Sequence, residues 1–177
     1  MNFVSCTDTA KLIRKALKAR FPSQKFSVRS DQYSGGASID VSWTDGPTEK
    51  LVESIVGRFA GSTFDGMQDL KEYHHSEVTT ELRMLAKRAK VELPGDPVHF
   101  GADFVFTRRK FTPSFLERVI AEIGERFHTP DRPTVDDFEQ GRAYNTHVLS
   151  GCSASDQYWS WQATIHRAAN DRTVLAA

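Results

Sequence analysis

The chain has 177 residues, of which 39% are hydrophobic and 26% charged, and this suits one domain or two small, closely packed ones. Its 23 basic and 23 acidic residues give a net charge of zero, which excludes a protein whose whole surface neutralises phosphate. No stretch approaches the roughly 18 apolar residues of a membrane span, and no secretion signal is evident. The two cysteines, Cys6 and Cys152, lie far apart. We therefore expect a reduced, cytoplasmic protein.

The first predicted element is a helix that Thr7 or Asp8 caps and Pro22 ends. Its apolar residues recur at the spacing of one helical face, and its basic residues occupy the other. Residues 1–30 hold seven basic groups and one acid, whereas residues 31–80 hold three basic groups and nine acids. This uneven distribution indicates either neighbouring elements that neutralise each other or a basic docking face. The basic residues of the helix are Lys11, Arg14, Lys15 and Lys18.

Residues 25–47 predict a β-hairpin followed by a turn. Apolar residues alternate with polar ones on both sides of Gly35-Gly36, and glycine supplies the backbone freedom that a tight turn needs. Asp45-Gly46-Pro47 ends the second strand and opens a helix over residues 48–59. The apolar stripe of this helix is expected to cover Ile39 and Val41.

The middle of the chain has a less regular pattern. Gly61 and Gly66 interrupt it, and we expect a short strand at Thr63-Phe64 followed by irregular or helical structure. Residues 77–90 predict a third helix. Apolar residues then alternate cleanly over residues 99–107, which predicts a strand.

From Thr112 the pattern of the first third is repeated approximately. Thr112 caps a helix, Pro113 occupies its first turn, and apolar residues continue to Phe127. Residues 143–149 and 157–167, the latter alternating through Trp159 and Trp161, predict a second hairpin. The predicted architecture is therefore α+β, with an antiparallel sheet covered by helices. Its two units, residues 1–75 and 76–177, are interpreted as a possible α-β-β duplication, for which chance agreement is the alternative.

Residue chemistry does not favour an enzyme. The six histidines show no HExxH and no Cys/His zinc spacing, so we expect no metal site and no cofactor. Asp136 and Asp137 are adjacent on a segment expected to be extended, where they face opposite ways and form no catalytic pair. Cys152 could approach His147 or His166 across the second hairpin, but a structural or incidental cysteine is the simpler interpretation.

Several motifs resemble one known family. They are Asp8-Thr-Ala-Lys-Leu-Ile-Arg-Lys-Ala-Leu-Lys18, Phe21-Pro22, Phe26-Ser-Val-Arg29, Tyr33-Ser-Gly-Gly-Ala-Ser-Ile-Asp-Val41, Trp43-Thr-Asp-Gly-Pro47 and Phe64-Asp-Gly-Met67. Together they resemble the large polyvalent protein-associated domain 29 family over residues 7–73, and residues 100–106 resemble sequence that follows the domain in some relatives. The resemblance implies a phage, prophage or plasmid context, in which such domains accompany proteins that protect an incoming element from host defences.

These observations lead to two functional hypotheses. The first is a non-enzymatic protein-binding module that inhibits a host defence protein or ribonucleoprotein complex, of the anti-CRISPR or anti-restriction type. Its acidic segment would occupy a basic groove of the partner, and a homodimer is an open alternative. The expected contacts are Asp65, Asp69, Glu72 and Glu77.

The second hypothesis is a nucleic-acid-binding accessory protein of a mobile element. In this hypothesis the basic helix contacts phosphates and an exposed tyrosine stacks on a base. The zero net charge and the lack of aromatic residues between the lysines argue against it. The expected contacts are Lys11, Arg14, Lys15, Lys18, Arg29 and Tyr33.

Overall fold

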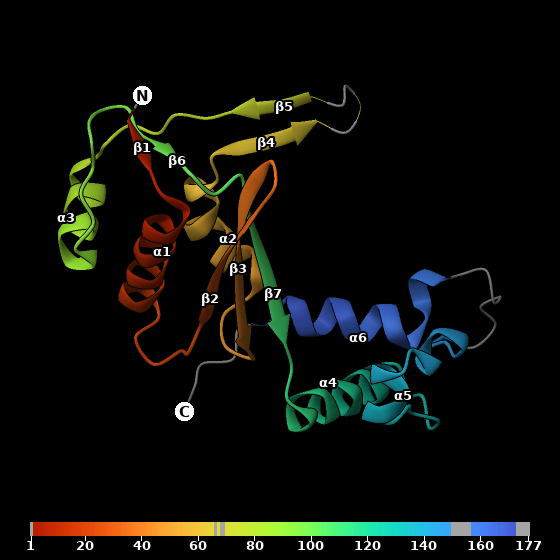
Figure 1. Cartoon of the computed structure of the whole chain (residues 1–177). Helices are drawn as coiled ribbons and strands as arrows, with labels where there is room; N and C mark the ends of the chain where they lie inside the picture. The colour runs from red at the N-terminus through yellow and green to blue at the C-terminus, as the bar shows by residue number, and fades with distance from the viewer. Residues whose placement is uncertain (1, 66, 68–69, 150–156, 173–177) are drawn as a thin grey trace. The chain divides into compact units, whose positions relative to one another are not determined.

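The computed structural model describes residues 2–65, 67, 70–149 and 157–172, and the chain forms two compact units (Figure 1). Among the described residues, unit 1 consists of the chain up to residue 43 together with residues 49–109, and unit 2 consists of residues 44–48 and the residues from 110 to 172. The predicted boundary between residues 75 and 76 therefore differs from the observed one. The difference arises because the predicted third helix packs against the first one, inside unit 1.

Unit 1 mixes helices with short sheets, and this confirms the α+β class. In chain order its elements are β1 (Phe3–Val4), α1 (Cys6–Arg20), β2 (Ser27–Tyr33), β3 (Gly36–Thr44), α2 (Glu49–Val56), the 3-10 helix η1 (Gly57–Phe59), β4 (Ser62–Asp65), β5 (Leu70–Tyr73), α3 (Thr80–Ala89), β6 (His99–Phe100) and β7 (Phe104–Lys110).

The predicted hairpin is confirmed as β2 and β3, which pair antiparallel from Ser27 opposite Ser42 to Tyr33 opposite Gly36. The third strand of this sheet is β7, beside β3. The Asp103 N–H donates to the Ala37 carbonyl at 2.7 Å, and farther along both strands the Asp45 N–H donates to the Lys110 carbonyl at 2.8 Å. Because both strands advance in the same direction between these bonds, β7 runs parallel to β3.

The strand predicted over residues 99–107 is in fact two strands. The first, β6, pairs in parallel with β1, with Phe3 opposite His99 and Val4 opposite Phe100. The second, β7, joins the main sheet after a bend at residues 101–103. The alternating pattern correctly predicts extended chain, but alternation alone does not show that the chain changes sheet at Gly101.

Helix α1 begins one residue before the predicted caps. The Ser5 Oγ accepts the Asp8 N–H at 3.1 Å, so Ser5 is the cap and Thr7 and Asp8 lie within the first turn. The end of the helix at Arg20 agrees with the prediction from Phe21-Pro22. Helix α2 with η1 confirms the predicted helix over residues 48–59, and α3 begins later than predicted because Thr79 caps it.

The segment after Thr63 also differs from the prediction. The expected short strand is present as β4, but β5 replaces the irregular or helical structure. The two strands pair antiparallel, with Ser62 opposite Tyr73 and Asp65 opposite Leu70. This pairing supplies hydrogen-bond partners for a backbone whose side chains show little apolar periodicity.

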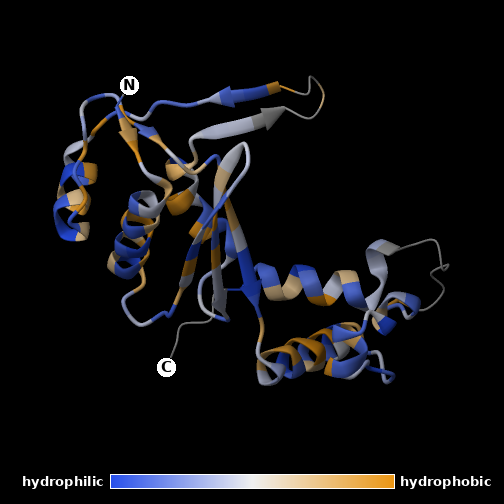
Figure 2. Cartoon of the chain, in the orientation of Figure 1, coloured by the Kyte–Doolittle hydropathy of each residue, from blue (hydrophilic) through white to orange (hydrophobic). Residues whose placement is uncertain are grey.

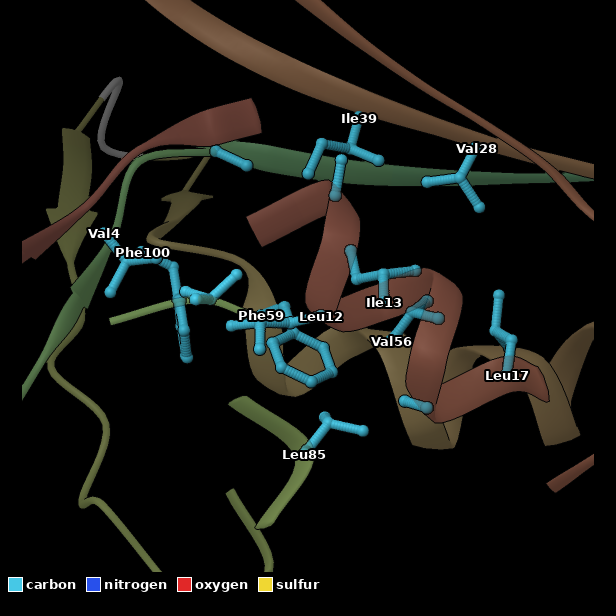
Figure 3. Packing of buried hydrophobic residues seen from close by; sticks show 14 of the residues in the cluster. Val4, Leu12, Ile13, Leu17, Val28, Ile39, Val56, Phe59, Leu85 and Phe100 are labelled. Atoms are coloured by element: carbon cyan, nitrogen blue, oxygen red, sulfur yellow. The ribbon is translucent and has the colours of Figure 1, made fainter. Parts of the chain in front are cut away.

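The core of unit 1 lies where α1 meets the sheet, α2 and α3. In Figure 3 the α1 side chains Leu12, Ile13 and Leu17 lie among residues from the sheet and the other helices. All three are fully buried, and so are Ile39 and Phe59. Burial of such a side chain contributes about 1.5–3 kcal/mol relative to exposure, so this helix stabilises the unit through one apolar face. Along α1 and α4, orange apolar segments alternate with blue polar ones (Figure 2).

In the part of the chain that the structure describes, unit 2 is helical. Its elements are α4 (Pro113–Arg126), α5 (Val135–Glu139), the 3-10 helices η2 (Arg142–Asn145) and η3 (Gln157–Trp159), and α6 (Trp161–Asn170). Helix α4 confirms its prediction, because the Thr112 Oγ1 accepts the Phe115 N–H at 3.3 Å and Pro113 follows. The Asp45 carboxylate also accepts the Thr112 N–H, at 2.9 Å, so the turn that follows β3 is hydrogen-bonded to the start of α4.

The predicted second hairpin and the α-β-β duplication are wrong. Residues 161–167 of the predicted strand instead form part of α6, and Ser160 caps this helix by accepting the Ala163 N–H at 3.2 Å. The alternation through Trp161 and Ile165 also fits the four-residue spacing of a helix, and Ala169 continues that spacing on the buried face. Residues 143–149 contain a 3-10 turn and a single bridge from His147 to Ser160.

Candidate functional site

One end of unit 1 carries a hollow of about 410 Å³. It lies at the tip of the β2–β3 hairpin, beside β1, β5 and the bend between β6 and β7. Each of these elements is held by backbone pairing, so the side chains around the hollow come from a rigid frame. The residues that line it are Phe3, Ser5, Cys6, Gln32, Tyr33, Gly35, Gly36, Ala37, Lys71, Tyr73, His99, Gly101 and Asp103.

An ion pair holds the hollow together. The Lys71 Nζ lies 2.8 Å from the Asp103 Oδ1, and the Asp103 carboxylate is 12% exposed. Asp103 also accepts the Ala37 N–H through Oδ2 at 3.1 Å. The hydrogen bond that the Lys71 ammonium donates to Asp103 raises the pKa of Lys71. The carboxylate thus joins β5 to the hairpin tip.

Gly36 makes this arrangement sterically feasible. A Cβ atom at this position would lie 2.2 Å from the Asp103 Oδ2 and 3.1 Å from the Tyr33 ring. Its neighbour Gly35 has a φ of +102°, which glycine adopts without the strain that other residues meet. The two glycines therefore have different roles, since one forms the turn and the other leaves space for the carboxylate.

A cysteine and a histidine line the hollow, and the side chain of each is hydrogen-bonded to a backbone carbonyl. The buried Cys6 thiol donates to the Ser38 carbonyl at 3.6 Å, and burial raises its pKa, with a smaller effect from the charges of Asp103 and Asp31. The His99 ring donates through Nδ1 to the His74 carbonyl at 2.8 Å. Because a thiol acts as a nucleophile only when ionised, Cys6 is held in its unreactive form.

Alkylation of Cys6 is expected to be slow in the folded protein. Burial raises the pKa of its thiol, so the thiolate is disfavoured at neutral pH in the folded chain and regains its ordinary population on unfolding. Iodoacetamide labelling of the Cys6 peptide at pH 8, followed by mass spectrometry, should be at least about tenfold slower in buffer than in urea. Equal rates would show that the thiol is accessible.

Exposed aromatic side chains border the hollow. Phe3, Tyr33 and Tyr73 are 53%, 48% and 59% exposed. Tyr73 also contacts the Lys71 ammonium, which lies 5.0 Å from its ring centroid. Met67 and Leu70, on the hairpin that bears Tyr73, are exposed as well. Aromatic residues beside a hollow are typical of protein-binding surfaces, because they bury a large area with few rotatable bonds.

Neither of the predicted acidic contacts Glu72 and Glu77 lines the hollow. Glu72 is exposed on β5, directly before Tyr73, and Glu77 is exposed between β5 and α3. Asp65 is the last residue of β4, and Asp69 lies outside the described residues. The carboxylate that the structure shows to be built into the hollow, Asp103, was not among the predicted residues.

The predicted nucleic-acid contacts are divided between different places. Lys11 pairs with Asp8 at 2.7 Å. Arg14 donates to the Val28 carbonyl and Lys18 to the Pro22 carbonyl, each at 2.5 Å, whereas Lys15 is exposed. The other two are on β2, where Arg29 lies opposite Asp40 and Tyr33 borders the hollow. Three of the four helix cations therefore bind this chain's own groups.

Unit 2 has a larger cavity, of about 790 Å³, beside α5 and η2. Its Arg142 side chain pairs with Asp136 and, at 2.7 Å, with Asp137, and the Thr134 hydroxyl and Arg142 together lower the pKa of Asp137 to about 2. The Arg142 guanidinium is thus held by two carboxylates of the same unit. We therefore place the candidate site in unit 1, where exposed aromatic groups and a hollow coincide.

Across residues 2–65, 67, 70–149 and 157–172, no cluster of three or more histidine, cysteine or carboxylate side chains is placed to hold a metal ion. Within those same limits, no helix combines the length and the apolar character needed to cross a membrane.

The fold and the hollow describe a small α+β domain with an aromatic-bordered concave end. Comparison with known families identifies it further: the family model described as large polyvalent protein associated domain 29 matches residues 4–112. This is more than half of the chain, so the protein belongs to that family, and the resemblance inferred from the sequence is confirmed. The match ends at Thr112, the third residue of the segment of unit 2 that begins at Lys110, so the family domain corresponds closely to unit 1.

The family is associated with large polyvalent proteins of mobile genetic elements. Neither a search of curated proteins nor a search of solved structures finds a match to this chain.

Proposed function

We propose that this chain is a non-enzymatic protein-binding module of a mobile element, and that it inhibits a host defence protein or ribonucleoprotein complex. The observation that carries the proposal is the group of exposed aromatic residues Phe3, Tyr33 and Tyr73 around the hollow. Tyrosine is enriched among residues that contribute most of the energy of protein interfaces. The mobile-element context of the family supports a role in conflict with the host.

The exposed charges of this segment suggest the chemistry of the partner. Glu72 directly precedes Tyr73 and Glu77 follows it by four residues, both exposed, and the one lysine that lines the hollow is already neutralised by Asp103. A basic surface is the complementary partner, since opposite charges favour encounter and orientation. Complexes that bind nucleic acid present such surfaces. CRISPR and restriction complexes are therefore the candidate targets.

A non-enzymatic role is supported by the state of the two most reactive groups in the hollow. The Cys6 thiol is buried with a raised pKa, and the hydrogen bond to Asp103 raises the pKa of the Lys71 amine. A nucleophilic cysteine or lysine needs the opposite change in pKa. Both groups therefore serve the framework of the surface.

The test is capture from host lysate by the immobilised chain after nuclease treatment. The wild type should retain a defence protein, and the double variant Tyr33→Ser/Tyr73→Ser should lose at least about 90% of it, because hot-spot tyrosines contribute about 2 kcal/mol or more each. Tyr144→Ser is the matched control, since Tyr144 is 51% exposed but lies in unit 2. It should retain the partner as the wild type does.

Protection in the cell gives a second measurement. Phage plating or plasmid transformation should rise when the wild type is expressed in a host with an active defence system and should not rise with the double variant. No recovered defence protein, together with no protection, would contradict the proposal. Retention that disappears only after nuclease treatment would favour the nucleic-acid hypothesis.

A further inference from the structure

Strand β2 is an outer strand of the main sheet, because among the described strands it pairs with β3 alone. Tyr33 and Gly36 face each other across the two-residue turn Ser34-Gly35. In such a hairpin the pair that closes the turn exchanges backbone hydrogen bonds, and bonded pairs alternate with unbonded pairs along the strand. Ser27, Arg29, Asp31 and Tyr33 therefore bond to β3, and the residues between them direct their backbone groups outward.

A contact on the outer edge confirms this direction. The Arg14 guanidinium reaches the Val28 carbonyl at 2.5 Å from helix α1, so the backbone of Val28 does point away from β3. Ser30 and Gln32 follow at the same two-residue spacing and have exposed side chains. The described strand contains neither a proline nor a lysine, residues that often protect an edge from pairing. It therefore offers backbone donors and acceptors to a further strand.

The charge pattern of this edge is complementary to itself. An antiparallel pair of β2 strands centred on Ser30 places Arg29 of one copy opposite Asp31 of the other, twice. The same register brings together the residues whose backbone groups face outward, with Ser30 opposite Ser30 and Val28 opposite Gln32. Opposite charges that face each other across an antiparallel pair are stabilising, whereas a shift by one residue would misalign the backbone groups.

We propose that a second copy of this chain docks through β2, edge to edge, in the antiparallel register centred on Ser30. The Ser30 backbone groups then pair across the two-fold axis. On either side of it the Val28 N–H donates to the Gln32 carbonyl of the other copy, while Arg14 keeps the Val28 carbonyl. Strand addition to an open sheet edge uses these main-chain bonds for affinity and the charge pairs for register. The proposal does not depend on the target of the aromatic surface.

The experiment is sedimentation velocity of the full chain over a range of concentrations. The wild type should show a concentration-dependent dimer. Arg29→Asp and Asp31→Arg, tested separately, place like charges opposite each other and should each weaken the dimer at least about tenfold. An equimolar mixture of the two variants restores both opposite-charge pairs, so a heterodimer of about wild-type affinity should form. Lys15→Asp and Glu77→Arg make the same charge changes at exposed positions outside β2 and should leave the dimer unchanged.

Ser30→Pro provides a test that is independent of charge. Its N–H faces outward, so proline removes a donor needed for docking without breaking a β2–β3 bond. The variant should be monomeric with an unchanged circular dichroism spectrum. A wild type that stays monomeric at all concentrations would overturn the proposal. A mixture of charge variants that fails to associate would overturn it as well, and so would a folded Ser30→Pro variant that still dimerises.

Discussion

Replacement of Phe59 with alanine is expected to lower the free energy of unfolding of unit 1 by about 3–5 kcal/mol. The side chain is 0% exposed, and its ring packs edge-on against Phe100 with 5.3 Å between the centroids. Its removal leaves a cavity between the α1–α2 layer and the β1–β6 pair, which neighbouring backbone pairing prevents from closing. Urea-dependent hydrogen exchange of the β3 amides measures this effect in unit 1 alone.

Phe106→Ala is the matched control. Phe106 is 52% exposed on β7. Its replacement removes the same atoms as Phe59→Ala, but from a site that water already reaches. The expected cost is below about 1 kcal/mol. Equal costs for the two variants would contradict the position of Phe59 in the core.

Replacement of Gly61 with alanine is expected to lower the free energy of unfolding of unit 1 by about 3 kcal/mol, which is the upper part of the range for overpacking. The new Cβ atom would lie 2.0 Å from the Phe100 carbonyl oxygen and 3.2 Å from that of Ala102. Relief by a backbone shift is blocked, because the Gly61 N–H donates to Ala102 and its carbonyl accepts the His74 N–H, each at 2.7 Å. The same hydrogen-exchange measurement should show the loss in unit 1.

Gly57→Ala provides the contrast for this variant. Gly57 lies four residues earlier, in η1, and a Cβ atom there meets nothing within 4 Å. Alanine should therefore leave the free energy of unfolding unchanged or raise it by about 0.4–1 kcal/mol, since it restricts the unfolded chain. A Gly61→Ala variant as stable as Gly57→Ala would show that the backbone at Phe100 can move.

Local signals were sufficient where one element carried both its pattern and its ends. Helix α1 has its apolar face at helical spacing and Pro22 after it, α4 has Thr112-Pro113 before it, and the β2–β3 hairpin has alternation around Gly35-Gly36. In each case the residues that form the element also terminate it, so a single segment holds the information. The family resemblance over the first part of the chain was recognisable for the same reason.

Segments whose pattern fits two structures needed the fold to decide between them. Trp161 and Ile165 alternate as in a strand and also recur as on a helix, and packing against α4 selects the helix. The hollow likewise could not be predicted from local patterns. Lys71 and Asp103 are 32 positions apart, and they meet only when β5 has paired with β4 and β7 with β3. By itself the sequence determined the α+β class, the hairpin and the two strongest helices. Only the tertiary structure decided the unit boundary, the helical second unit and the site, because these depend on contacts between residues distant in the chain.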